Sequence, residues 1–315
     1  MNPKITKRRG IFWLYHLIPV LCFTPLMSSP IALGSGILLA LFSKNLLRFD
    51  AQKLTPFLLQ TAIVLMGFGM NLNQVIATSK TGLYLTVFSV FFTILGGLAL
   101  GKFLKIDRNT TLLISCGTAI CGGSAIAAIS PIINARNDQL TFSLTVVFVL
   151  NALALLLFPH VGHLFGFSQE TFGFWSAIAI HDTSSVVGAS ASYGAKALEI
   201  ATTVKLTRAL WIIPLSIGLV FFNKKNEHVK INIPWFIGLF VLAILFSHFI
   251  PQWNPIFHQL NWLGKKGMLL ALFFIGASLK KEDLKTAGLK PFLLGVALWI
   301  AISVSSFVVL TRIMY

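Results

Sequence analysis

Apolar residues follow one another along this chain in long runs that charged residues interrupt only briefly. Five stretches without Asp, Glu, Lys or Arg exceed 25 residues, namely 10–43, 54–79, 109–135, 139–169 and 231–264. A helix needs about 20 mostly apolar residues to cross a bilayer. The pattern therefore predicts 11 transmembrane helices, at 11–26, 30–43, 56–72, 82–101, 111–133, 140–160, 172–193, 198–222, 234–250, 267–280 and 291–312.

Composition supports this pattern. Residues of the AVILMFWYC set make up 56% of the chain and charged residues only 11%, against about 25% in an average soluble domain. So few charges cannot cover a soluble protein of 315 residues, and a disordered chain would be far less apolar. We therefore predict an all-α polytopic membrane protein that resides in the lipid bilayer.

The charged residues indicate an orientation. Lys and Arg number 25 against 9 acidic residues, and basic residues that flank membrane spans collect on the cytoplasmic side. This explains the net charge without nucleic acid. With the N-terminus inside, 17 basic residues fall in inside segments and 6 in outside ones. We predict an inner-membrane protein with a cytoplasmic N-terminus and a periplasmic C-terminus, although the loop 161–171, placed inside, contains no Lys or Arg.

Two pairs of segments resemble each other within the chain. Residues 119–130 (AICGGSAIAAIS) align without a gap over 179–190 (AIHDTSSVVGAS), and 69–72 (GMNL) align over 276–279 (GASL). Inverted repeats are common in transporters. We predict a basic segment with a first helix at 1–29, a first five-helix repeat at 30–160, a connecting loop at 161–171 and a second, inverted five-helix repeat at 172–315.

Cys121, Gly122, Gly123 and Ser124 lie in the middle of the fifth predicted span. Each glycine costs about 1 kcal/mol in a helix relative to alanine, so this pair favours a break. A break at membrane depth exposes backbone groups that could bind a substrate, and the N-terminus of the second half-helix attracts anions. Close packing of small residues explains the same pattern equally well.

Asp182 is the one carboxylate that these spans place deep in the membrane, between His181 and the hydroxyl residues Thr183, Ser184 and Ser185. An intramembrane acid costs roughly 2.5–3.5 kcal/mol and usually marks a transport pathway or a partner. Histidine titrates near neutral pH, so His181 and Asp182 could bind a coupling proton or Na⁺. The hydroxyls could replace the hydration shell of an ion. The alternative is a structural network in which Asp182 only neutralises a cation.

Lys205 and Arg208 lie three residues apart in the eighth predicted span, on one helix face. Arg208 lies about 15 Å from the start of that span, at a depth similar to that of Asp182. We expect Arg208 to pair with Asp182, which would leave the charge of Lys205 for an anionic substrate. Alternatively, Lys205 is itself paired or extends its side chain towards the membrane surface.

Other candidate residues are less informative. Asn71, at the end of the third span, could coordinate a substrate or cap a helix. The cysteines Cys22, Cys116 and Cys121 lie in apolar runs without a C-x-x-C pattern, so we expect neither disulfides nor a metal site. No P-loop, H-E-x-x-H or G-x-S-x-G motif occurs. We expect no cofactor and no enzymatic activity, and Cys121 is better explained as a packing residue than as a nucleophile.

The chain resembles the YeiH-type family of bacterial membrane proteins, which carries the label of sulfate exporters. The similar segments are AIVLMGFGMNLNQV (63–76), AICGGSAIAA (119–128), AIHDTSSVVGAS (179–190), VKLTRALWIIP (204–214) and PWFIGLF (234–240). That family usually has two alanines after Cys-Gly and a Glu after His, where this chain has Gly123-Ser124 and Asp182. The resemblance implies a secondary transporter related to sodium/bile-acid symporters and cation/proton antiporters. It also implies inverted five-helix repeats, a panel domain, and a core domain with broken crossing helices.

These observations favour a secondary active transporter, in the exporting direction, for a small anion such as sulfate, sulfite or an organosulfonate-derived anion. Asn71, Cys121–Ser124, Thr183–Ser185, Lys205 and Arg208 would bind the substrate, while His181 and Asp182 would bind H⁺ or Na⁺. Transport would proceed by alternating access. A monovalent cation/proton antiporter that uses Asp182 and an anion channel are the alternatives. The chain could also form a homo-oligomer.

Overall fold

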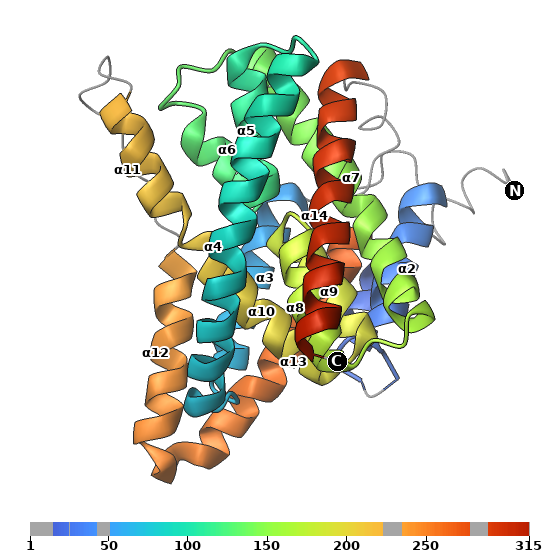
Figure 1. Ribbon diagram of the computed structural model, residues 1–315. Coiled ribbons are helices and arrows are strands. Elements are labelled where there is room, and N and C mark those ends of the chain that lie inside the picture. The colour runs from blue at the N-terminus through green and yellow to red at the C-terminus, as the bar shows by residue number, and fades with distance from the viewer. Residues whose placement is uncertain (1–14, 25, 43–50, 223–234, 278–288, 315) are drawn as a thin grey trace, which may run out of the picture. The chain divides into compact units, whose positions relative to one another are not determined.

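The computed structural model of the chain describes residues 15–24, 26–42, 51–222, 235–277 and 289–314, and the regular elements of these residues are helices (Figure 1). Of the first predicted span, 11–26, residues 11–14 and 25 lie outside them. The chain forms two compact units, each built from two separate stretches. Unit 1 comprises Met1–Gln74 and Pro234–Lys280, and unit 2 comprises Val75–Ile233 and Lys281–Tyr315.

Several helices are long and apolar enough to cross a membrane. Within the described residues these are Leu72–Phe103, Asp138–Leu164, Ala195–Phe221 and Leu289–Arg312, and a bent pair at Trp235–Ala277 would make a fifth span. Residues 31–40 and 55–67 form shorter apolar helices. The chain is therefore a multi-pass membrane protein, while the count of 11 spans and the division into two five-helix repeats stay predictions.

Unit 1 contains α2 (Ser29–Phe42), α3 (Ala51–Gly67), α12 (Trp235–Phe249) and α13 (Asn254–Ala277). Helix α13 packs against both α2 and α3. Glycines make the closest approach possible, because a Cβ on Gly36 would lie 3.1 Å from the Cα of Gly276 and would overlap the carbonyl oxygen of Phe273. Small residues let helix backbones approach this closely in membranes.

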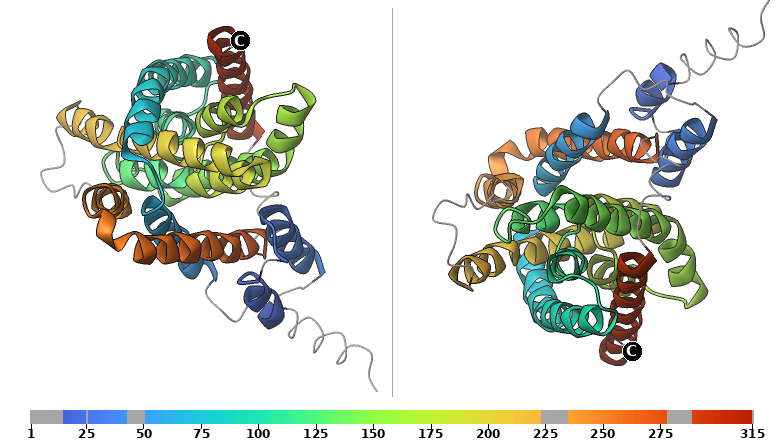
Figure 2. Two further views of the ribbon diagram at one scale, coloured as in Figure 1. Left: turned by 90° about the horizontal axis from the view of Figure 1, so that it is seen from below. Right: turned by 90° about the horizontal axis from the view of Figure 1, so that it is seen from above.

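The connection between α12 and α13 differs from the expected loop at 251–266. A single 3₁₀ turn, η1 (Pro251–Trp253), separates the two helices, which are bent by 99° (orange in Figure 2). Pro251 cannot continue α12 because it has no N–H, whereas Pro255 is tolerated in the first turn of α13. Lys266, expected outside a helix, lies in α13 and donates to the carbonyl of Thr24 at 2.7 Å. Hydropathy alone misses this polar first half of α13.

Unit 2 combines long helices with short ones. The long elements are α4 (Leu72–Phe103), whose first residues precede the boundary of the unit, α7 (Asn137–Leu164), α10 (Ala195–Ala209) followed by α11 (Ile212–Phe222), and α14 (Leu289–Met314). The short elements are α5 (Arg108–Ala119), α6 (Gly123–Ile129), α8 (Gln169–Ala179) and α9 (Thr183–Tyr193). These short helices form two pairs.

The first pair, α5 and α6, is a helical hairpin, which we call hairpin one (residues 107–136). The amide of Asn109, at the start of α5, donates to the carbonyl of Ile133 at 3.5 Å. Leu113 and Ile129 belong to one buried apolar cluster, although they lie on opposite sides of the helix break. The chain therefore returns to the end of unit 2 from which it started.

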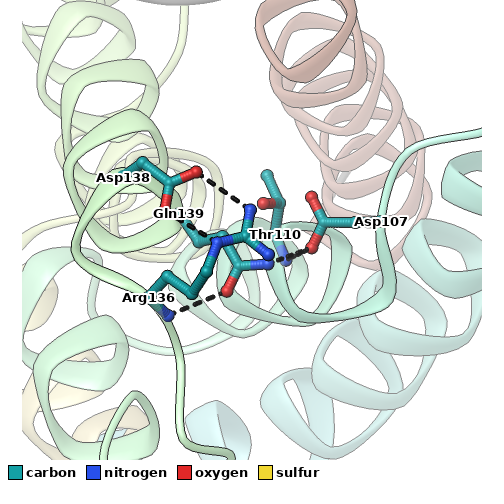
Figure 3. A network of polar contacts seen from close by, with 5 residues as sticks. All are labelled: Asp107, Thr110, Arg136, Asp138 and Gln139. Carbon is teal, nitrogen blue, oxygen red and sulfur yellow. Dashed lines mark hydrogen bonds and ion pairs between the residues drawn. The ribbon is translucent and has the colours of Figure 1, made fainter.

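A polar network closes the base of hairpin one (Figure 3). Asp107 Oδ1 accepts from the backbone N–H of Thr110 at 2.9 Å and from Gln139 Nε2 at 2.7 Å. Gln139 Oε1 in turn accepts from the backbone N–H of Arg136 at 2.9 Å, and the Arg136 guanidinium binds both carboxylate oxygens of Asp138. Asp107 caps α5 and Gln139 lies in the first turn of α7, so the network ties the start of the hairpin to its end.

The second pair, α8 and α9, forms hairpin two (residues 167–194). The hydroxyl of Tyr193, the last residue of α9, donates to the carbonyl of Phe167 before α8 at 2.5 Å. The rings of Tyr193 and Phe172 are stacked with centroids 3.8 Å apart. Deeper in the hairpin the hydroxyls of Ser176 and Ser190 lie 3.0 Å apart. These contacts pair the two helices along their length.

Neither 111–133 nor 172–193 forms one continuous helix, because each segment breaks and folds back on itself as a hairpin. The position of the hairpins in the membrane stays a prediction. The base of hairpin one contacts Gln139 near the start of α7, whereas the Tyr193 ring of hairpin two stacks on His163 near the end of α7. The hairpins therefore enter unit 2 from opposite ends. An apolar segment has the same hydropathy whether it crosses or turns back, so the sequence pattern cannot distinguish the two.

Candidate functional site

The tips of the two hairpins meet beside the middle of α7. Gly122, at tip one, adopts φ +65°, and a Cβ placed on it would lie 3.0 Å from the Cβ of Asp182 at tip two and 3.3 Å from Val147 on α7. A side chain would therefore meet both a strained backbone and a filled space. This contact brings the two motifs that sequence reasoning singled out into one place.

The internal alignment places both breaks in register. Helix α5 ends at Ala119 and α8 ends at Ala179, while α6 begins at Gly123 and α9 at Thr183. These positions are equivalent in the ungapped match of 119–130 with 179–190. The shared sequence pattern therefore encodes the same three-residue break twice.

Asp182 is the N-cap of α9. Its Oδ1 accepts from the backbone N–H groups of Ser184 at 2.5 Å and Ser185 at 3.1 Å, and its Oδ2 accepts from the Ser185 hydroxyl at 2.7 Å. The helix N-terminus and these donors stabilise the carboxylate. The expected ion pair between Asp182 and Arg208 is not formed, because the Arg208 guanidinium contacts backbone carbonyls instead.

Arg208 joins the two tips. Its Nε donates to the carbonyl of Ala119 at 2.5 Å and its Nη2 to that of Thr118 at 3.0 Å, both at the C-terminal end of α5. Its Nη1 donates to the carbonyl of Ala177 at 3.2 Å and to that of Ile178, at the end of α8. The guanidinium is planar with donors on several edges, which suits such a bridge.

The ammonium of Lys205 hydrogen-bonds to tip two. Its ammonium donates to the carbonyls of Ile180 at 2.7 Å and Ala177 at 3.3 Å. Lys205 and Arg208 are both 0% exposed, so Lys205 does not extend to the membrane surface. Carbonyls at a helix C-terminus carry partial negative charge and have no partner within the helix. The two cations therefore satisfy the ends of both broken helices.

Asn151, in the middle of α7, is a site residue that sequence reasoning missed. Its Oδ1 accepts from the backbone N–H groups of His181 at 3.1 Å and Asp182 at 3.3 Å. An amide in the middle of a long apolar helix was the available signal. His181 is fully buried, and neither its ring nitrogens nor the Asn151 amide nitrogen has a hydrogen-bond partner among the described residues.

The remaining candidate residues differ in their surroundings. Ser124 is exposed, Gly123, Thr183 and Ser184 are half-buried, and Cys121 and Ser185 are buried. Asn71 belongs to unit 1, where its Oδ1 accepts from the backbone N–H of Gln74 at 3.2 Å and caps α4. Its part in substrate binding stays a prediction. Within the part of the chain that the structure describes, no three His, Cys, Asp or Glu side chains are grouped to hold a metal.

Comparisons with known proteins identify the family. Residues 14–295 match the family described as conserved hypothetical protein 698. A UPF0324 membrane protein of Photobacterium profundum is 49% identical over 93% of this chain and 90% of its own length. Others from Shewanella oneidensis and Bacteroides thetaiotaomicron are 48% and 46% identical over 91% and 89% of this chain, and over 90% and 85% of their own lengths.

No solved structure matches the chain. The resemblance to the YeiH-type membrane proteins is confirmed at the level of the family, since the family match and these relatives cover most of the sequence. The chain therefore belongs to the UPF0324 family of membrane proteins.

Proposed function

We propose that the chain is a secondary active transporter, an exporter, for a small oxyanion such as sulfate, sulfite or an organosulfonate-derived anion. The observation that carries this proposal is the charge at the hairpin tips. Lys205 and Arg208 are fully buried there, and Asp182 is the carboxylate beside them. Two cations against one acid favour an anionic ligand.

The helix ends do not alter this balance. Each tip joins a helix C-terminus, with about −0.5 charge, to a helix N-terminus, with about +0.5. These partial charges cancel over the two breaks, so the side chains leave about one unit of positive charge. In a site of low dielectric constant such a charge attracts an anion much more strongly than in water.

Hydroxyl and amide donors near the tips suit an oxyanion. Ser124 is exposed, and Thr183 and Ser184 are half-buried in the first turn of α9. Serine and threonine hydroxyls donate readily to sulfate-type oxygens. We assign them, with the backbone of Cys121–Gly123, to substrate binding, and we assign His181 and Asp182 to coupling by H⁺ or Na⁺.

The hairpins also increase the excess of basic residues on the cytoplasmic side in the proposed orientation. If hairpin one opens to the cytoplasm and hairpin two to the periplasm, Arg136 moves to the inside and the loop 161–171, which has no Lys or Arg, moves to the outside. By the predicted spans the basic residues then divide 18 inside to 5 outside, and Lys265 and Lys266 of the outside group lie within α13. This supports a cytoplasmic N-terminus and a periplasmic C-terminus in the inner membrane.

We infer that transport follows alternating access, in which one compact unit moves against the other. Arg208 holds both tips together by hydrogen bonds to four carbonyls. Opening one tip away from the other would leave several of these groups without partners at membrane depth, which is costly. Movement of the hairpins as one body avoids this loss.

Radiolabelled sulfate flux into proteoliposomes tests the proposal, with sulfite and methanesulfonate as competitors. We expect saturable flux that falls at least about tenfold, a loss of about 1.4 kcal/mol, in Lys205→Met and Arg208→Gln. Lys196→Ala is the matched control, because Lys196 lies on the same helix in a partly exposed ion pair with Glu199. Full-rate flux in both charge variants would refute the electrostatic argument.

Two other outcomes would replace the proposal. A pH change that depends on a monovalent cation and needs no anion would identify a cation/proton antiporter that uses Asp182. Flux that neither saturates nor responds to a gradient of H⁺ or Na⁺ would identify an anion channel. Size-exclusion chromatography and thermal unfolding of each variant separate loss of transport from loss of folding.

A further inference from the structure

The C-terminal ends of the two broken helices are occupied by side-chain cations. Two side chains, Lys205 and Arg208, make six hydrogen bonds to backbone carbonyls there. The accepting residues are Thr118, Ala119, Ala177, Ile178 and Ile180. Both hairpin tips are included in this set.

Such carbonyl groups are ordinary ligands for a free cation. In transporters with broken helices, unwound carbonyls and half-helix C-termini commonly coordinate Na⁺. The ends of α5 and α8 offer the same chemistry, because Ala119 and Ala179 are followed by three-residue breaks. In this chain an ammonium and a guanidinium already lie where the carbonyls converge.

Neutralisation of Asp182 does not account for this arrangement. The oxygens of Asp182 accept from Ser184 and Ser185, whereas the donors of Lys205 and Arg208 are directed to carbonyls. The hydrogen bonds of the two cations are therefore made to the helix C-termini and not to the acid.

We propose that Lys205 and Arg208 are tethered replacements for a bound monovalent cation, so that the hairpin tips are complete without Na⁺. The two residues are positioning residues in this role. The inference rests on the proposed function in one respect only. Of the two candidate coupling ions, H⁺ and Na⁺, it excludes Na⁺ bound at the hairpin tips. It predicts that loss of the Lys205 ammonium creates a cation site bounded by Ala177 and Ile180.

Thermal unfolding of the full-length chain in detergent tests this without a substrate. Wild type, Lys205→Ala and the control Lys196→Ala are compared in sodium, methylammonium and choline chloride at equal ionic strength. We expect wild type and Lys196→Ala to unfold at the same temperature in all three salts. We expect Lys205→Ala to lose about 5 °C or more in choline and to recover most of it in methylammonium or sodium.

Equilibrium binding of radioactive sodium gives a second readout. Wild type should bind only background amounts, whereas Lys205→Ala should bind an amount approaching one ion per chain, in competition with methylammonium. Specific sodium binding to the wild type, or sodium-specific stabilisation of it, would overturn the proposal even if Lys205→Ala failed to fold. Equal destabilisation of Lys205→Ala in all three salts would also overturn it, because a merely structural lysine would behave in that way.

The transport assay adds a separate arm. Replacement of Na⁺ by choline at constant pH and membrane potential should leave wild-type flux unchanged. If the chain transports no anion at all, the proposed function fails while the unfolding and binding results still decide the role of Lys205. If flux requires Na⁺ and the wild type binds it, the replacement of sodium is refuted and anion transport remains.

Discussion

Gly122 lies directly against Asp182, with only 3.0 Å between the Asp182 Cβ and the position that a Cβ on Gly122 would take. The two residues come from hairpins that enter unit 2 from opposite ends, and they occupy equivalent positions in the two similar segments. The absence of a side chain at one position is therefore what admits the acid at the other.

This contact makes Gly122→Ala a sharp test. A non-glycine residue at φ +65° costs about 1–3 kcal/mol, and here the methyl group would also displace Asp182. We expect a lower unfolding temperature and loss of flux. Gly166→Ala is the matched control for strain, because Gly166 also has φ +65° but no atom within 4 Å of the added Cβ. If Gly122→Ala and Gly166→Ala lose the same amount of stability, backbone strain alone explains the loss. Close packing of the tips is then not required.

Cysteine labelling tests the hairpins. The native cysteines Cys22, Cys116 and Cys121 are buried, so we expect an impermeant maleimide not to react with them. They can be left in place or replaced by alanine. Single cysteines at Lys105 and Arg136 should react with an impermeant maleimide from one side of the membrane. Single cysteines at Glu170 and Lys196 should react from the other side.

The competing arrangement gives a different pattern. If residues 111–133 crossed the membrane, Arg136→Cys would react from the side opposite to Lys105→Cys. Labelling of these two positions from opposite sides would therefore exclude hairpin one. Full-length protein in inside-out and right-side-out vesicles provides both orientations.

Removal of the Asn151 side-chain amide should weaken tip two. In Asn151→Leu the backbone N–H groups of His181 and Asp182 lose their acceptor, and a buried unsatisfied donor costs about 1–3 kcal/mol. We expect a lower unfolding temperature. Asn151→Asp keeps an acceptor oxygen and should lose less stability, while Thr145→Ala on the same helix removes only a bond to its own backbone. Wild-type stability in Asn151→Leu would refute the role of Asn151.

The substitution Asp182→Asn distinguishes the role of the negative charge of Asp182 from its role as the N-cap of α9. Asp182→Asn keeps an acceptor for the N–H groups of Ser184 and Ser185 but removes the negative charge, so we expect a modest stability loss of about 0.5–1 kcal/mol. If Asp182 binds the coupling proton, the pH dependence of flux should disappear.

Asp107→Asn is the matched control for this change. Asp107 also caps a helix, α5, and lies in the network at the base of hairpin one. It should lower stability to a similar extent while the pH dependence of flux stays that of wild type. Identical pH profiles for wild type and Asp182→Asn would remove Asp182 from the coupling step.

Local sequence features identified which residues lie at the hairpin tips better than they identified the direction of the chain through each hairpin. The glycine pair at 122–123 correctly indicated a break, and Lys205 and Arg208, predicted on one helix face, both donate to the carbonyl of Ala177. The partners were not predictable, because a cation at membrane depth can be satisfied by a carboxylate or by carbonyls. Every residue has a backbone carbonyl, so residue types do not show which carbonyls lose their helical partner at a break.

The reversal of each hairpin was also beyond hydropathy. A crossing span of 23 residues, 111–133, and a hairpin of the same residues are equally apolar. One clue was present, since the loop 161–171 contains no Lys or Arg although the crossing arrangement places it inside. The start of α13 was missed for a different reason, because its first half is too polar to register as a span.

The bridge made by Arg208 also constrains the order of biosynthesis. Ala119 precedes Arg208 by 89 residues, and a ribosome needs roughly 5 to 20 s to add that many. During this interval the carbonyls at the tip of hairpin one have no guanidinium to bind. The nascent chain must therefore keep this tip hydrated or shielded by the insertion machinery until the eighth apolar segment arrives, so the two halves of the site mature together and not in succession.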